Sequence, residues 1–297
     1  MSKQQIKGVL PPMITPFKED GELDYDKHIQ NMLHWEQDNL AGYVVLGSNS
    51  EAVYLTEAEK IKLIELTKAH STTKRLIIAG TGMESTRETV SLTNKAAKAG
   101  ADAALVVTPF YYKDQMNDIA LIKFYTELAD QSDIPVLIYN VTKFTHINIS
   151  AHAVSVLSRH SNIIGMKDSA GDIPQLVKFI DACTDDFNLM VGTASAWYPA
   201  LTLGIRAGIM ALANCAPNSC AEVQQAFEAG DHKRARTIYL RLFPVNTAVT
   251  ATYGVAGLKY AADLTGYEGG WVRSPLVSLQ EEAKQQIKSI VTTAGLI

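Results

Sequence analysis

The chain has 297 residues and a net charge of -4 at pH 7. Hydrophobic residues make up 47% of it and charged residues 20%, which is typical of a globular protein with a substantial core. The slight excess of acidic residues gives no electrostatic reason to bind nucleic acid or an anionic membrane, so we expect neither partner.

The first seven residues pass directly into an apolar segment without the pattern of a signal or transit peptide. No apolar run in the sequence approaches the length of a membrane span. On these two observations we expect a cytoplasmic protein.

Eight short apolar runs recur from the start of the chain to about residue 215, each ending in polar or glycine residues. Their starts are spaced by roughly 20 to 34 residues, which suits a strand, a loop, a helix and a second loop in each unit. Their continuous apolar character favours parallel strands that are covered on both faces. The runs span residues 8–15, 42–48, 75–81, 101–108, 134–140, 162–169, 187–193 and 207–214.

The segments between these runs carry signals for helix ends. Thr56 with Glu59, and Ser85 with Glu88, have the spacing of a capping box, in which each side chain binds a backbone amide of the first helical turn. Gly100 is the expected end of the second of these helices. The expected N-caps of two later helices are Ser150 and Asp172.

Eight strand-helix units of this size predict a (β/α)8 TIM barrel. After residue 214 the pattern changes, and residues 221–229, 232–249 and 278–293 have helical patterns with no strand-like run between them. We therefore expect a catalytic barrel in residues 1–216 and a C-terminal helical extension in residues 217–297, with residues 267–275 as a long loop inside the extension.

Lys167 is the first candidate for chemistry, because it ends the apolar run 162–169 and so lies where burial is expected. A buried lysine must pair with an acid, extend to solvent or lose its proton. A neutral lysine is a nucleophile toward ketones, which makes Lys167 a candidate Schiff-base former. The alternative is a structural ion pair with Asp168 or another carboxylate, and the run alone does not separate the two interpretations.

Tyr139 ends the preceding run, 134–140, and the active sites of barrels lie at the carboxyl ends of the strands. Neighbouring strands would bring this phenol close to the Lys167 amine, where a cation would tune it for proton transfer. Strand tyrosines are more often packing residues, so the interpretation depends on Lys167.

The second run ends in a turn of small residues, 47–51, which contains Ser48 and Asn49. The free amides of such a turn, together with these two side chains, suit the carboxylate of a 2-oxo acid, although an ordinary strand-helix turn has the same pattern. After the fourth run, Tyr111 is a candidate proton relay, although paired tyrosines beside a proline more often pack a loop.

Other signals for cofactors are missing from the sequence. Residues 80–85 lack the third glycine of a dinucleotide-binding loop, no P-loop is present, and the seven histidines have no metal-binding spacing. The three cysteines lack a repeated CxxC spacing, so we expect small buried side chains rather than disulfides or a zinc site. No metal or nucleotide is therefore expected.

Four motifs, taken together, resemble those of the dihydrodipicolinate synthase / N-acetylneuraminate lyase family of class I aldolases, and the similarity runs almost end to end. Within the family the chain is most similar to the 4-hydroxy-2-oxoglutarate aldolases, including Ala248-Val-Thr and Gly257-Leu-Lys259 in its tail. The four motifs are Gly47-Ser-Asn-Ser-Glu51, Thr108-Pro-Phe-Tyr-Tyr112, Ile138-Tyr-Asn-Val141 and Gly165-Met-Lys-Asp-Ser169.

The resemblance implies a (β/α)8 barrel with a C-terminal helical extension, usually a homotetramer built as a dimer of dimers. It also implies a reaction without a cofactor, in which pyruvate or a longer 2-oxo acid forms a Schiff base with Lys167. By the same resemblance Tyr139 is the general acid and base, and Tyr111 is a relay tyrosine that can approach a neighbouring subunit's site. The implied substrate-binding residues are Ser48, Asn49, Ser169 and Gly192.

The sequence departs from the family at three positions. Ser50 replaces the usual glycine, which would stiffen or reshape the carboxylate-binding turn, and Thr142 stands where most members have proline. Phe144 occupies the position of the arginine that binds the aldehyde's carboxylate in the synthases of lysine biosynthesis. An aromatic ring cannot supply that charge, which disfavours a synthase unless Lys143 or another residue compensates.

We therefore expect a class I aldolase that reversibly cleaves a 4-hydroxy-2-oxo acid, such as 4-hydroxy-2-oxoglutarate, into pyruvate and an aldehyde, glyoxylate in that case. The expected partners are thus small molecules. The alternatives are a 2-keto-3-deoxy sugar-acid aldolase, an N-acetylneuraminate lyase and 4-hydroxy-tetrahydrodipicolinate synthase. A non-enzymatic alternative is a regulator that binds 2-oxo acids, because fold does not fix function.

Overall fold

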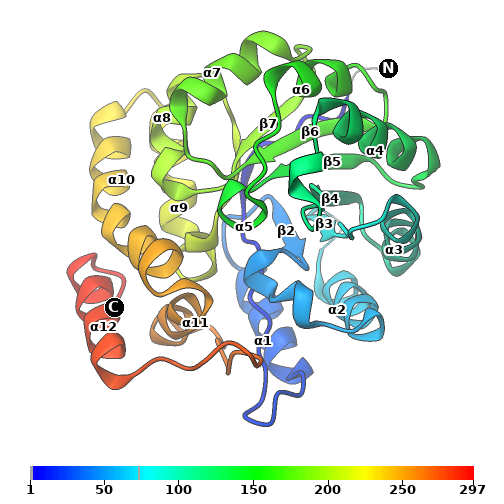
Figure 1. Cartoon of the computed structure of the whole chain (residues 1–297). Coiled ribbons are helices and arrows are strands. Elements are labelled where there is room, and N and C mark those ends of the chain that lie inside the picture. Colours follow the sequence, from blue (N-terminus) through cyan, green and yellow to red (C-terminus); the bar gives the residue numbers. More distant parts are fainter. Residues whose placement is uncertain (1–2, 73) are drawn as a thin grey trace.

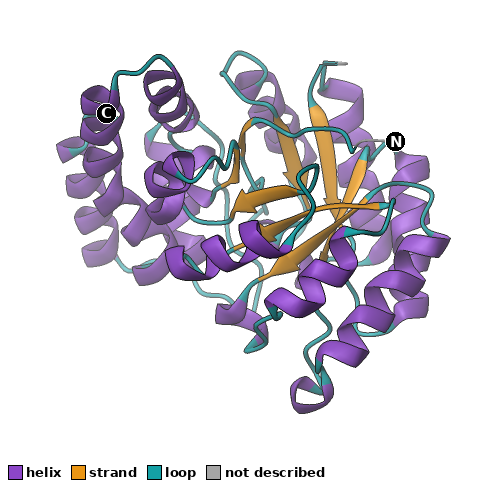
Figure 2. Cartoon of the chain, turned by 90° about the horizontal axis from the view of Figure 1, so that it is seen from above, coloured by secondary structure: helices purple, strands orange, loops and turns teal. Residues whose placement is uncertain are grey.

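A barrel of eight parallel strands with helices around it forms most of the molecule (Figures 1 and 2). The computed structural model describes residues 3–72 and 74–297. The strands are β1 (Gly8–Leu10), β2 (Gly42–Val45), β3 (Leu76–Gly80), β4 (Ala103–Val107), β5 (Val136–Asn140), β6 (Ile163–Asp168), β7 (Asn188–Val191) and β8 (Ala207–Ile209). The predicted (β/α)8 fold is confirmed, and each predicted run contains one strand.

The strands follow one another around the barrel in the order of the sequence, and β8 pairs with β1. Backbone hydrogen bonds then link the first and second strands, from Ala41 N to Val9 O (2.9 Å) and from Val44 N to Pro11 O (3.0 Å). The first predicted run is longer than its strand, which ends at Leu10. Pro11 and Pro12 follow, and proline cannot donate a hydrogen bond to a neighbouring strand.

The predicted helix signals are found at the predicted places. Thr56 and Glu59 form a complete capping box at the start of α2, and the Ser85 side chain accepts a hydrogen bond from Glu88 N (3.2 Å) at the start of α3. Gly100 ends α3 with a φ of 107°, a left-handed conformation that favours glycine. The helices of this part are α1 (Tyr25–Trp35), α2 (Glu57–His70), α3 (Thr86–Ala99), α4 (Asp118–Gln131), α5 (Thr142–Thr145), α6 (Ala151–Ser158), α7 (Ile173–Ala182) and α8 (Trp197–Thr202).

Helices continue after the eighth strand, as expected. They are α9 (Pro217–Glu228), α10 (His232–Thr247), α11 (Gly254–Leu264) and α12 (Glu281–Thr293), with a π-helical turn, η6 (Ala248–Thr252), between α10 and α11. Helix α9 packs against β1 and α8 and so takes the place of the helix that follows the eighth strand, whereas α10 to α12 stand beside the barrel (Figure 1). Helix α11, whose interior contains Gly257, was not predicted from the sequence.

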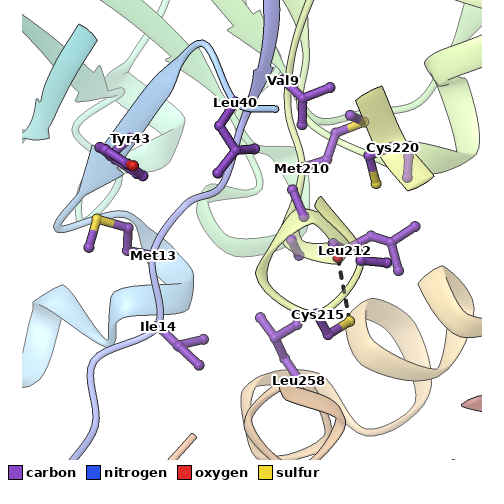
Figure 3. Packing of buried hydrophobic residues seen from close by; sticks show 14 of the residues in the cluster. Val9, Met13, Ile14, Leu40, Tyr43, Met210, Leu212, Cys215, Cys220 and Leu258 are labelled. Carbon is purple, nitrogen blue, oxygen red and sulfur yellow. Dashed lines mark hydrogen bonds between the residues drawn. The ribbon is translucent and has the colours of Figure 1, made fainter. Parts of the chain in front are cut away.

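The extension is packed into the barrel's core rather than tethered to its surface. Leu258 of α11 is fully buried and lies close to Cys215, which follows the short helix η5 (Ala211–Asn214) after β8 (Figure 3). Cys215 and Cys220 are buried free thiols, as expected, but Cys183 is only partly buried. Within residues 3–72 and 74–297, no helix is long and apolar enough to cross a membrane.

Candidate active site

A cavity of about 640 Å³ opens at the carboxyl ends of the strands. Its walls include residues that end or follow β2, β5, β6 and β7, and also residues of α10, η6 and α11. Six of the seven residues predicted for the site line it; they are Ser48, Asn49, Tyr139, Lys167, Ser169 and Gly192.

Lys167 lies near the end of β6 and is only 3% exposed. It pairs in register with Tyr139 of β5, and its Nζ lies 4.2 Å from the centre of the Tyr139 ring. Among the described residues, no carboxylate oxygen lies within 4.0 Å of that Nζ. The cavity therefore contains an amine that has a phenol beside it and no counter-ion.

The alternative ion pair between Lys167 and Asp168 is not formed. Successive side chains of a strand point to opposite faces, so Asp168 is directed away from the lysine. Its Oδ1 accepts hydrogen bonds from Asn140 Nδ2 (2.7 Å) and Gln175 Nε2 (3.1 Å). This acid therefore serves the packing between β5, β6 and α7.

Tyr139 has the environment of a group that exchanges protons. Burial raises the pKa of its phenol. The charge of Lys167 and the nearby hydroxyls of Ser48 and Ser169 lower the pKa by more than burial raises it, so the pKa of Tyr139 falls below its ordinary value. Ser48 Oγ lies 3.4 Å from the Tyr139 hydroxyl, which is a long contact for two hydroxyl groups. Ser48 thus connects the phenol to the turn after β2.

The turn after β2 forms a short 3-10 helix, η1 (Ser48–Ser50), between two residues with left-handed backbones, Leu46 (φ 63°) and Glu51 (φ 55°). Such conformations are uncommon for residues other than glycine and are often held in place at functional sites. Ser50 itself is not left-handed. Its Oγ donates to Met13 O (2.5 Å) and accepts from Gly47 N (3.1 Å), so the hydroxyl at this unusual position fixes the turn to the segment after β1.

The C-terminal extension also holds this turn. The carboxylate of Glu51 is completely buried, and Lys259 of α11 forms an ion pair with it at 2.5 Å. The second oxygen of Glu51 accepts a hydrogen bond from Arg273 N (2.8 Å), while the Arg273 guanidinium binds Glu59 at 2.6 Å. The residues that follow the barrel therefore fix the shape of a turn inside it.

The absence of a side chain at Gly192 makes room for Lys167 and Ser169. A Cβ on Gly192 would lie 2.9 Å from Lys167 Cε and 1.8 Å from Ser169 Oγ, so a larger residue at 192 would displace the lysine or the serine. Ser169 Oγ is buried and makes no well-formed hydrogen bond within the described chain, although it lies close enough to Tyr139 to favour the phenolate. It is available to a bound molecule.

Tyr111 is the predicted site residue that the single chain does not bring to the cavity. Its side chain is 74% exposed and packs edge to face on Tyr112, with ring centres 5.0 Å apart. The backbone amides of Phe110 and Tyr111 donate to the Glu84 carboxylate, which fixes the loop. The exposed phenol is thus held in a defined place outside its own chain's cavity.

Another wall of the cavity is formed by α5 and by residues of the C-terminal extension. Phe144 of α5 is 53% exposed and lines the cavity, as does Lys143, whose Nζ donates to Thr250 O of η6 (2.8 Å). No cavity residue was predicted from the extension, yet Phe243 and Asn246 of α10 and most of η6 line the cavity. Helical periodicity indicated helices there but carried no signal of where they pack.

Residues 5–294 match the Dihydrodipicolinate synthetase family. The chain is 35% identical over 292 residues to the 4-hydroxy-tetrahydrodipicolinate synthase of Archaeoglobus fulgidus, which covers 98% of this chain and 99% of that protein. It is 28% identical, with a TM-score of 0.92, to a crystal structure of dihydrodipicolinate synthase from Bacillus anthracis, over 97% of this chain and 98% of that one. The chloride-inhibited synthase of Acinetobacter baumannii, solved in complex with pyruvate, is 29% identical with a TM-score of 0.91 over 98% and 100% of the two chains.

The chain belongs to the dihydrodipicolinate synthetase family. Its members are cofactor-free, pyruvate-dependent aldolases of the Schiff-base class, so the prediction of a lyase is confirmed. The narrower expectation of a special similarity to 4-hydroxy-2-oxoglutarate aldolase is not confirmed, because these relatives are named synthases. Phe144, which by the sequence resemblance stands in place of the synthases' arginine, lines the cavity.

Proposed function

We propose that this family member reversibly cleaves a 4-hydroxy-2-oxo acid with a second carboxylate, such as 4-hydroxy-2-oxoglutarate, into pyruvate and glyoxylate. One observation carries the choice of substrate. Among the described residues that line the cavity, the charged side chains are Lys167 and Lys143, and no aspartate or glutamate is among them. A cavity with two lysines and no acid suits a dianion.

Lys167 is the proposed nucleophile. Its Nζ attacks the C2 ketone, and loss of water gives an iminium that withdraws electrons from the C3-C4 bond. When that bond breaks, the electron pair forms an enamine at C3, and Tyr139 takes the proton of the 4-hydroxyl. Tyr139 then helps to protonate C3, and water releases pyruvate from the lysine. The short distance from Nζ to the phenol ring and the lowered pKa of the phenol support these roles.

The turn after β2 is the proposed site of the carboxylate next to the ketone. Ser48 and Asn49 line the cavity, and the strained residues on either side hold the turn in one shape. The side chains of Ser48 and Asn49 and the free amides of η1 provide donors for an anion. Ser169 and Gly192, which pack beside Lys167, complete the wall around the pyruvyl group.

The assembly and the division of the chain are also part of the proposal. Tyr111 would serve the site of a neighbouring copy in a homotetramer, which its exposure outside its own cavity supports. Residues 1–216 would form the catalytic barrel and residues 217–297 the extension that completes one wall of the cavity.

The second candidate is 4-hydroxy-tetrahydrodipicolinate synthase, the name of the curated relatives. It shares the pyruvate half of the reaction but condenses it with an aldehyde that carries both a carboxylate and an ammonium group. Lys143 could bind that carboxylate in place of the missing arginine, but no acid among the described lining residues would bind the ammonium. The cavity therefore favours the aldehyde without an amine.

The test has two stages. Incubation with pyruvate and borohydride, followed by intact mass and peptide mapping, should give one reduced pyruvyl adduct on Lys167, and Lys167→Ala should give none while retaining the wild-type circular dichroism spectrum. An adduct elsewhere, or turnover by Lys167→Ala, would refute the mechanism. The second stage compares kcat/KM for glyoxylate, aspartate semialdehyde, N-acetylmannosamine and glyceraldehyde. Preference for any aldehyde but glyoxylate would refute the substrate.

A further inference from the structure

Asn246 is a buried amide that its own chain leaves unsatisfied. It lies in the last turn of α10, is only 3% exposed, and lines the cavity that contains Lys167. Its side-chain Oδ1 has no hydrogen-bond partner among the described residues. Buried polar groups are almost always hydrogen-bonded, so an unpaired one in a cavity wall indicates a position that a ligand or water completes.

The neighbourhood of Asn246 is positively charged and fixed in shape. Thr250 Oγ1 donates to the backbone carbonyl of Asn246 (2.6 Å), and the backbone carbonyl of Thr250 accepts from Lys143 Nζ (2.8 Å). The π-helical turn η6 thus connects the backbone of Asn246 to the ammonium group of Lys143. Such turns within helical segments are frequent at functional sites.

The bond to Thr250 uses one of the three hydrogen atoms of the Lys143 ammonium group, which leaves two donors. An asparagine side chain offers two donors on Nδ2 and an acceptor on Oδ1. Together they match a hydroxyl and a carboxylate on adjacent carbon atoms, because the hydroxyl can donate while the carboxylate only accepts. A sugar chain, with a neutral hydroxyl in place of the carboxylate, would leave the lysine charge without a partner.

We propose that Asn246 is a specificity-determining residue that binds the hydroxy-carboxylate end of the substrate. Its Nδ2 donates to the terminal carboxylate, and its Oδ1 accepts from the 4-hydroxyl in the bound substrate, before that hydroxyl rotates and passes its proton to Tyr139. This inference rests on the proposed function and narrows it to 2-oxo acids that end in such a group. Lys143 provides a positive charge near the same end of the substrate, and Asn246 provides directional hydrogen bonds. The pyruvyl half, held by residues on the other strands, does not depend on Asn246.

The test compares Asn246→Ala with Asn246→Asp, using KM for glyoxylate in the addition to pyruvate and the yield of the borohydride-reduced pyruvyl adduct. Asn246→Ala should raise KM for glyoxylate about tenfold, the order of one hydrogen bond to a charged group, with the adduct yield unchanged. Asn246→Asp should raise it further, because an acid there repels the terminal carboxylate. Thr237→Ala, an exposed position on the same helix, is the control and should match the wild type.

Adduct yield and thermal stability separate recognition from packing. Aspartate has nearly the shape of asparagine, but at this 3% exposed position its buried charge lowers stability by itself. A loss of adduct yield and thermal stability in Asn246→Ala that parallels its rise in KM for glyoxylate, or a smaller rise in KM in Asn246→Asp than in Asn246→Ala, would overturn the inference. If the wild-type enzyme forms the adduct but does not use glyoxylate, the proposed function fails and the inference with it. If neither variant alters the turnover of glyoxylate, the inference about Asn246 is refuted, whereas the proposed function stands.

Discussion

Lys167 and Lys259 are both buried, with exposed fractions of 3% and 1%, and both lie over an aromatic ring. Lys167 Nζ is 4.2 Å from the centre of the Tyr139 ring, and Lys259 Nζ is 4.6 Å from that of Phe17. They differ in what else they contact. Lys259 binds the Glu51 carboxylate and the carbonyl of Trp271, whereas Lys167 contacts no described carboxylate and faces the cavity.

In the proposed mechanism, access to the cavity rather than burial distinguishes the nucleophilic lysine from the structural one. Burial lowers the pKa of Lys259 to about 8, although Glu51 acts in the opposite direction. A lowered pKa is often taken as a sign of a functional site, yet structural ion pairs produce it as well. Lys259 is absent from the described cavity lining, and its hydrogen bonds are directed to the protein, so it stabilises the junction of barrel and extension.

The largest expected effect on stability comes from Lys259→Met. This change leaves the Glu51 carboxylate buried without its partner, and breaking a buried ion pair in this way typically costs about 3–5 kcal/mol. The free energy of unfolding, measured by urea titration, should fall by that amount. The double variant Glu51→Gln/Lys259→Met removes both charges and should recover much of the loss. Equal stability of Lys259→Met and wild type would show that the pair does not hold the junction.

Lys167→Met, which also removes a charge, should abolish turnover and change the pKa of Tyr139. The lysine's charge favours the phenolate, whereas burial disfavours it, so in Lys167→Met the pKa of Tyr139 should rise above its ordinary value of about 10. Spectrophotometric titration would follow this shift, with Tyr139→Phe as the reference that lacks the signal. The wild type should show one phenol that ionises below that value.

Tyr139→Phe itself should lower kcat by about 10²-fold, the usual scale for the loss of a general acid and base. The adduct with pyruvate should still form on Lys167, more slowly. An unchanged kcat would assign proton transfer to another group. If Lys167→Met leaves the pKa of Tyr139 unchanged, the charge of Lys167 does not act on the phenol. Lys167 and Lys259 would then differ only in their access to the cavity.

The sequence predicted the barrel because each unit repeats a physical pattern. Strands buried on both faces need continuous apolar residues, and the positions of Lys167 and Tyr139 at the ends of two such runs placed them in one site. The capping residues predicted helix starts for the same reason, since Thr56 and Ser85 satisfy amides locally. These features depend on neighbours in the sequence.

The features that the sequence did not predict depend on contacts between distant segments. Asn246 lines the cavity only because α10 packs beside the barrel, and the partner of Glu51 lies 208 positions farther along, at Lys259. Helix α11 was missed because its interior contains Gly257, although there a Cβ would lie 2.4 Å from Tyr253 Cβ. A close approach therefore explains a residue that helix propensity disfavours.

The smallest expected effect concerns Ser50, the residue that replaces the family's usual glycine. Its hydroxyl holds the turn from the barrel side, as Glu51 and Lys259 hold it from the extension. Ser50→Ala removes both the donor to Met13 O and the acceptor of Gly47 N, and should lower the free energy of unfolding by about 2 kcal/mol, at about 1 kcal/mol for each hydrogen bond. Ser50→Gly should cost a further 0.5–1 kcal/mol or so, because glycine also loses more backbone freedom on folding.

Both changes at Ser50 should raise KM for pyruvate a few-fold and leave kcat unchanged, since the carboxylate-binding turn loosens while Lys167 and Tyr139 stay in place. Urea unfolding and steady-state kinetics on the same preparations would measure the two effects together. If either variant lowers kcat as strongly as Tyr139→Phe, the turn also positions the phenol, through the 3.4 Å contact with Ser48. In that case the activity of Lys167, like the stability provided by Lys259, would depend on the contacts between the barrel and the extension.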